Sequence, residues 1–147
     1  MPPPNAHAFY HVRLVKEGRP FYSAPITSPG EAAPFFQTRF GQAVEEHFAA
    51  LFLNARNVPL GWREISRGSV SASIVHPREV FLPAIQLASS SLILAHNHPS
   101  TDVTPSSDDI ELTRRLVKAG ELMGIEVLDH LIITQGEYLS LKERGLM

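Results

Sequence analysis

The sequence contains no cysteine among its 147 residues. This absence excludes a disulfide framework, a thiol nucleophile and a structural zinc site built from cysteine ligands. It also excludes a zinc deaminase, because those enzymes hold their metal with cysteine side chains that have no counterpart here. A chain of this length buries about two-thirds of its unfolded surface around one core, so it does not need covalent cross-links to fold.

Charge of one sign and long apolar runs are also scarce. The 13 Lys and Arg residues nearly balance the 15 Asp and Glu residues. Charge therefore gives no support for DNA binding, which depends on a basic field. No segment approaches the roughly 18 apolar residues of a membrane span, and residues 1–5 lack the basic and apolar regions of a secretory signal. We expect a cytoplasmic protein with no membrane partner.

The first third of the chain gives the weakest structural signals. Residues 1–8 are rich in proline and are predicted to be a disordered tail. Residues 9–45 are predicted to be an N-terminal extension made of a hairpin and a short helix. In that hairpin, residues 9–16 alternate like a strand and are expected to pair with residues 21–24.

Helix and strand signals become clearer further along the chain. Residues 28–31, with the sequence Ser-Pro-Gly-Glu, have the spacing of a capping box. They predict a short helix toward Phe40, with Pro34 inside it. Residues 48–53 form a short apolar run, and residues 69–75 also have the composition of a strand.

The second half of the chain alternates between helix and strand patterns. A helix is predicted from Pro77, where apolar positions recur on one face. Residues 91–95 are apolar on both faces, which is typical of a central strand buried on both sides. A second helix is expected over residues 105–123, with glycine as its C-terminal cap. Two strands are predicted to follow, over residues 125–134 and 138–141.

The residues with the clearest chemical meaning follow the predicted central strand. His96 and His98 are two positions apart, so their side chains project from the same face of an extended segment. Asp109 falls in the first turn of the next helix, where the proline-bounded loop can fold it back toward the histidines. Two imidazoles and one carboxylate leave one position of a tetrahedral zinc open, as in a catalytic site. Iron, cobalt and nickel use the same ligands.

The spacing of these residues resembles a known family. His96-x-His98-x7-Ser106-x2-Asp109 resembles the JAMM motif of the MPN/JAB metalloproteases. Residues 96–100, with the sequence His-Asn-His-Pro-Ser, are similar to the RadC-like branch of that superfamily. Further matches to this branch lie at residues 76–81, 104–106 and 129–130. The motif is much more specific than its His-x-His pair, which arises by chance in about one of three chains with this histidine content.

The resemblance implies a fold and a division of roles. Residues 46–147 are expected to form a single α/β domain with a mixed central sheet flanked by helices, layered like the cytidine deaminases. The family's general base falls on Glu46, and its oxyanion-stabilising serine falls on Ser106. Glu45 and Glu64 are alternatives for the base. The spacing of Ser106 and the acidic residue three positions later also fits a plain helix N-cap.

Two further residues or pairs bear on this motif. The pair Asp129-His130 is a candidate for orienting a metal ligand, with a packing role as the simpler interpretation. Thr101 departs from the branch, which usually has glycine there. Because threonine tolerates a positive φ poorly, the local loop is expected to differ.

Three functions are consistent with these observations. The first is a zinc-dependent hydrolase of amide or isopeptide bonds, acting on a peptide or protein conjugate. The second is a DNA repair or DNA-associated factor, because the RadC name is attached to repair. Longer relatives carry a helix-hairpin-helix segment, which residues 1–45 do not resemble. The third is a non-catalytic MPN scaffold, although such proteins usually lack the metal ligands that this chain retains. The sequence does not indicate an oligomeric state.

Overall fold

A mixed β-sheet organises the computed structural model, which describes residues 1, 4, 8–16, 18, 24–71 and 74–147. The sheet has five strands in the order β2-β1-β3-β4-β5. Their bounds are β1 (His47–Leu53), β2 (Pro59–Arg67), β3 (Ser91–Asn97), β4 (Glu126–Ile133) and β5 (Tyr138–Ser140). β3 and β4 are parallel, and the other neighbouring pairs are antiparallel. The predicted mixed α/β fold is therefore confirmed.

β3 lies at the centre of the sheet, between β1 and β4. All of its residues are buried, as the apolar run at residues 91–95 predicts. Parallel pairing of β3 with β4 requires a crossover connection, and the helix α3 (Ser107–Met123) supplies it. The loop from the end of β3 to the start of α3 therefore lies at one end of the sheet.

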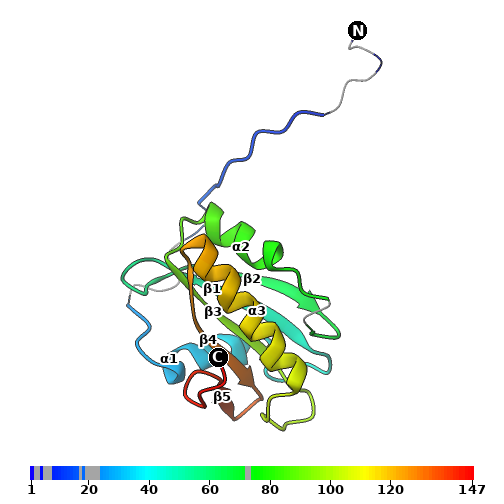
Figure 1. The fold of residues 1–147 in the computed structure, drawn as a ribbon, viewed down its shortest axis with the longest axis vertical. Coiled ribbons are helices and arrows are strands. Elements are labelled where there is room, and N and C mark those ends of the chain that lie inside the picture. Colours follow the sequence, from blue (N-terminus) through cyan, green and yellow to red (C-terminus); the bar gives the residue numbers. More distant parts are fainter. Residues whose placement is uncertain (2–3, 5–7, 17, 19–23, 72–73) are drawn as a thin grey trace.

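Helices cover both faces of the sheet (Figure 1). α2 (Pro77–Gln86) and α3 pack on one face, and α1 (Pro29–Phe40) packs on the other. We call these the α2/α3 face and the α1 face. Each face buries its own apolar cluster against the strands. None of the helices in the described part of the chain is long and apolar enough to span a membrane.

The alternation of side chains along β3 determines which residues meet which helices. Leu94 joins the core of the α2/α3 face, and Ala95 joins the core of the α1 face. Because side chains alternate along a strand, His96 follows Leu94 and Asn97 follows Ala95. The side chains of His96 and Asn97, at the end of β3, therefore lie on opposite faces of the sheet.

The N-terminal part of the chain differs from its prediction. Residues 8–16 form no strand, so the strand expected over residues 9–16 is wrong. These residues are exposed and lead away from the body of the protein (Figure 1). Most of the expected partner at residues 21–24, and most of the predicted disordered tail, lie outside the described residues. An alternating pattern makes a strand only where a neighbouring strand accepts its hydrogen bonds.

The second strand prediction, for residues 69–75, is also wrong. The described part of residues 69–75 contains no strand, and the strand lies earlier, over Pro59–Arg67. β2 is an edge strand that pairs only with β1. Its mixture of proline, glycine and charged residues hides the strand in the sequence, because a half-exposed edge does not need a regular apolar pattern.

The short helix predicted toward Phe40 is confirmed as α1, but its capping box does not form. Ser28 occupies the N-cap position without a side-chain capping bond. The carboxylate of Glu31 accepts a hydrogen bond from the backbone N–H of Thr27 at 2.7 Å, one residue before the position that a capping box requires. The helix continues through Pro34.

Candidate metal centre

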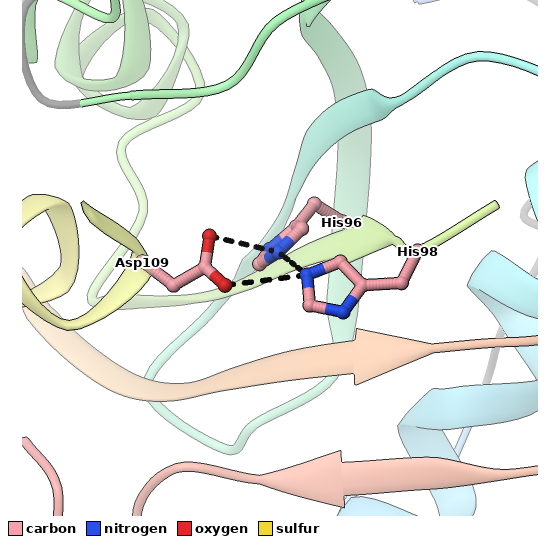
Figure 2. A group of neighbouring side chains, drawn as sticks. All are labelled: His96, His98 and Asp109. Atoms are coloured by element: carbon pink, nitrogen blue, oxygen red, sulfur yellow. Dashed lines mark hydrogen bonds and ion pairs between the residues drawn. The ribbon is translucent and has the colours of Figure 1, made fainter. Parts of the chain in front are cut away.

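Three side chains converge where β3 ends and α3 begins. Figure 2 shows His96, in β3, and His98, just after β3, pointing toward Asp109 in the first turn of α3. The two histidine Nε2 atoms are 2.9 Å apart. His96 Nε2 lies 3.2 Å from Asp109 Oδ1, and His98 Nε2 lies 3.2 Å from Asp109 Oδ2. Among the described residues, this is the one group of three or more His, Cys, Asp or Glu side chains positioned to hold a metal ion.

The geometry of this cluster fits a small divalent ion. Donors bound to a tetrahedral zinc at 2.0–2.1 Å lie about 3.3 Å from one another. The donor atoms of this cluster are 2.9 to 3.2 Å apart, which is close to that value. A set of two imidazoles and one carboxylate also leaves one tetrahedral position without a protein ligand. The predicted trio is therefore brought together in a form that suits a catalytic metal.

Burial and a negative charge make the cluster a suitable binding site for a cation. His96 is fully buried and Asp109 is 4% exposed, whereas His98 is only partly buried. Burial would raise the pKa of the Asp109 carboxyl, but the hydrogen bonds from the two histidines outweigh it and hold this pKa well below its usual range. The hydrogen bond to Asp109 in turn raises the pKa of His98. Asp109 therefore presents a full negative charge at neutral pH.

Ser106 holds the Asp109 carboxylate in place. Ser106 is the N-cap of α3, and its Oγ accepts a hydrogen bond from the backbone N–H of Asp109 at 3.1 Å. The backbone N–H of Ser106 donates to Asp109 Oδ2 at 2.8 Å. This reciprocal capping box fixes the carboxylate so that its oxygens face the histidines. The N-cap interpretation of Ser106 is therefore confirmed.

Glu46 lies beside the cluster but outside its ligand set. It immediately precedes β1, and its Oε2 accepts a hydrogen bond from the backbone N–H of Val70 at 3.1 Å. Its charge contributes to the raised pKa of His98, after the larger effect of Asp109. Glu46 is therefore close enough to interact electrostatically with a candidate ligand.

Asn97 connects the segment around Glu46 to β3. It is 1% exposed, and its Oδ1 accepts a hydrogen bond from the backbone N–H of His47 at 2.6 Å. Its Nδ2 donates to the carbonyl of Glu45 at 3.0 Å. These bonds flank Glu46 on both sides. Asn97 has no predicted role, although a buried polar residue at the end of a central strand needs hydrogen-bond partners.

The two alternative bases are paired with cations. Glu64 contacts His47 and accepts hydrogen bonds from Arg67 at 3.1 Å. The bond from Arg67 is the largest cause of the lowered pKa of Glu64. Glu45 lies 3.8 Å from Arg67 Nε. Because a paired carboxylate holds a proton less readily, Glu64 is a weaker candidate than Glu46.

Of the pair Asp129-His130, only His130 reaches the cluster. His130 is fully buried on β4, and its Nε2 lies 2.7 Å from His96 Nδ1. Complete burial holds the pKa of His130 well below its ordinary value. Asp129 instead accepts a hydrogen bond from Ser140 Oγ at 2.6 Å. Adjacent residues of a strand face opposite sides, so the two members of the pair have separate tasks.

The loop between the histidines and Asp109 contains a strained residue. Thr101 has φ 69°, a left-handed conformation that favours glycine. Its backbone N–H donates to the carbonyl of His98 at 3.1 Å, which closes a tight turn. A non-glycine residue in this conformation costs about 1–2 kcal/mol. The threonine therefore adds backbone strain next to a candidate ligand.

The fold and the cluster define an α/β protein with a candidate metal centre, and comparison with known sequences adds its family. A sequence model of the RadC-like JAB domain family matches residues 26–146, so the chain belongs to this family. The match begins upstream of residue 46, where the metal domain is predicted to begin, and it includes α1. The packing of α1 on the sheet agrees with this wider span.

Relatives in several bacteria are similar over most of this chain. The UPF0758 protein STH371 of Symbiobacterium thermophilum is 45% identical over 137 residues, which cover 93% of this chain and 58% of that protein. A UPF0758 protein of Staphylococcus carnosus is 50% identical over 120 residues, which cover 82% of this chain and 53% of that protein. The chain thus spans little more than half the length of these curated relatives.

Proposed function

We propose that this protein is a metal-dependent hydrolase of amide or isopeptide bonds, with zinc as the expected metal. The observation that carries the proposal is the convergence of His96, His98 and Asp109, with donor atoms 2.9 to 3.2 Å apart. Membership of the RadC-like JAB family and the resemblance to the JAMM motif support the same chemistry.

In this proposal the chain's own residues divide the work of hydrolysis. His96, His98 and Asp109 hold the ion, which when bound polarises a carbonyl and makes water a stronger nucleophile near neutral pH. Glu46 takes a proton from the attacking water as the C–O bond forms. It then delivers this proton to the leaving nitrogen as the C–N bond breaks. Oε2 accepts a hydrogen bond from the backbone N–H of Val70, and we assign the proton transfer to Oε1.

Ser106 has a second proposed role beside its capping bond. Its oxygen accepts from the backbone N–H of Asp109, so its own proton stays available for donation. We propose that this proton stabilises the negative charge that develops on the carbonyl oxygen during attack. The partner in hydrolysis is expected to be a peptide or a protein conjugate.

The test compares the substitutions Glu46→Gln and Asp109→Asn for bound metal and for turnover. Zinc-loaded protein is incubated with a library of peptides containing amide and isopeptide bonds, and cleavage is followed by mass spectrometry. Glu46→Gln is expected to keep its metal and lose about a hundred- to ten-thousand-fold in rate, since it removes only the general base. Asp109→Asn is expected to lose metal first and activity as a consequence.

Glu45→Gln is the matched control, because Glu45 is the exposed neighbour of Glu46. It should leave both metal content and turnover unchanged. Full turnover in Glu46→Gln would place the base elsewhere, and loss of metal from that variant would make Glu46 a ligand. If the zinc-loaded wild type cleaves no member of the library, the assignment of amide hydrolysis is overturned.

A further inference from the structure

We propose that Thr113 and His130 form a buried hydrogen-bond relay that holds His96 in the tautomer required of a metal ligand. This inference rests on the metal site of the proposed function. It adds two positioning residues, which lie behind the ligands and do not contact the reacting atoms.

The relay begins on α3. Thr113 lies one helical turn after Asp109, and its Oγ1 donates to the Asp109 carbonyl at 2.6 Å. A hydroxyl has one proton, so the same oxygen can only accept in its contact with His130 Nδ1, also at 2.6 Å. The proton of that second bond must therefore sit on His130 Nδ1.

The surroundings of His130 determine how many protons its ring carries. Its side chain is fully buried, and its ring nitrogens contact a hydroxyl and another imidazole, neither of which is an anion. A buried cation without a charged partner is strongly disfavoured, so His130 is neutral and has one proton. With that proton on Nδ1, His130 Nε2 can only accept. Its partner at 2.7 Å, His96 Nδ1, must therefore donate.

This sequence of bonds determines which atom His96 offers to a metal. With its proton on Nδ1, His96 presents the lone pair of Nε2, the atom that lies 3.2 Å from Asp109 Oδ1. Metal-binding histidines usually donate their second N–H to a carbonyl, carboxylate or water, which fixes the tautomer and the ring orientation. Here a neutral histidine serves as that acceptor.

His98 reaches the same tautomer by a simpler route. Its Nδ1 lies 2.7 Å from the backbone carbonyl of Asp102, which can only accept, so Nδ1 carries the proton. Its Nε2, which contacts Asp109 Oδ2, is therefore the nitrogen that offers a lone pair once a cation takes the place of the proton between them. When a cation replaces the protons between the two histidines and Asp109, the three side chains direct lone pairs at one point. One ligand is oriented by the loop, and the other by the relay.

Zinc affinity of the folded protein tests the relay directly. His130→Leu replaces the imidazole with an apolar group of similar size and removes the acceptor for His96. Competition against a chromophoric chelator should show zinc binding about ten- to a hundred-fold weaker than in the wild type. Thr113→Val, which removes only the hydroxyl, should weaken binding in the same direction but less. His130→Gln, which can place an amide oxygen near the former Nε2, should recover part of the affinity.

The control is Thr134→Val, because Thr134 is also a buried threonine but its hydroxyl bonds to the carbonyl of Glu137. Its zinc affinity should equal that of the wild type. Circular dichroism of the metal-free variants checks that each is folded. NMR of zinc-loaded, ¹⁵N-histidine-labelled protein should show a slowly exchanging Nδ1–H on His96 in the wild type, and faster exchange in His130→Leu.

The possible failures point to different conclusions. A wild type that binds zinc and a His130→Leu variant that binds it equally well would overturn the relay and leave the proposed function standing. Equal losses in Thr113→Val and Thr134→Val would also overturn it, because packing alone would then explain both. A wild type that takes up no zinc would overturn the proposed function and the relay together.

Discussion

The two faces of the central sheet are built in different ways. The α1 face is packed with aromatic and aliphatic side chains, such as Phe36 and Leu51. The α2/α3 face has a similar apolar cluster, but where β3 ends it also buries His96, Thr113 and His130, all fully enclosed. Buried polar groups are tolerated only where each has a hydrogen-bond partner. The α1 face therefore mainly supplies stability, whereas one end of the α2/α3 face contains polar side chains in place of apolar ones and orients the candidate ligands.

The largest expected effect tests whether the α1 face is independent of the site. Phe36 is fully buried there, so Phe36→Ala should lower the free energy of unfolding by about 3–5 kcal/mol. Zinc affinity of the folded variant should stay at the wild-type value, because Phe36 packs on the side of the sheet away from the candidate ligands. Urea unfolding with a chelator present measures the first quantity, and zinc competition measures the second. A large loss of affinity would show that the two faces are coupled.

Removing the metal tests how far the α2/α3 face depends on the bound ion for its stability. If zinc is present at a hundred to a thousand times its dissociation constant, chelation should lower the free energy of unfolding by about 3–4 kcal/mol. The metal-free chain should remain folded, since the two apolar clusters that form the core contain none of the candidate ligands. Circular dichroism and thermal unfolding with and without a chelator measure this difference. Complete unfolding on chelation would make the metal structural.

The strained loop beside the site gives a smaller effect of the opposite sign. Thr101→Gly should raise the free energy of unfolding by up to about 1 kcal/mol, because glycine adopts the positive φ without steric cost but loses more entropy on folding. Thr101→Ala, which removes only the branched side chain, should give a smaller gain. Thermal unfolding of the metal-free proteins compares them. A loss of stability in Thr101→Gly would show that the threonine side chain makes a compensating contact.

The smallest expected effect concerns Glu64 near the base candidate. Its hydrogen bond from Arg67 is the main reason that its pKa is below 4.5, and the contact with His47 adds to this. Because the folded-state pKa is below the unfolded one, the stabilisation is present above about pH 4.5 and is lost as the pH falls through the folded value. Glu64→Gln should therefore cost about 0.5–1 kcal/mol at pH 7, as is usual for partly exposed pairs. Unfolding curves should show a smaller loss of unfolding free energy from Glu64→Gln at pH 3 than at pH 7. An equal loss at both pH values would exclude an ionic origin.

The three ligands were predictable because their geometry is local. Two histidines separated by one residue share a face of a strand, and Asp109 follows in the first turn of the next helix. The apolar run of β3 likewise predicts its central position. The relay is different, since His96 and His130 are 34 positions apart and meet only through the pairing of β3 with β4. The sequence predicts only that the pair Asp129-His130 is a candidate for orienting a ligand, and nothing in the local spacing of Thr113 indicates its contact with His130.

The wrong strand predictions also have physical causes. An alternating segment at residues 9–16 has the composition of a strand but no hydrogen-bonding neighbour among the described residues. β2 has such a neighbour in β1, although its own sequence contains Pro59 and Gly61. Strand formation thus depends on partners that a single segment does not reveal.

The most direct test of the central claim is the metal content of protein purified without a chelator, measured by plasma mass spectrometry. The wild type is expected to contain one divalent ion per chain, predominantly zinc. The double variant with His96→Ala and His98→Ala should contain none, because a single carboxylate does not hold zinc. Circular dichroism of both proteins confirms that the variant is folded. Full metal stoichiometry in the folded double variant would contradict the proposed site.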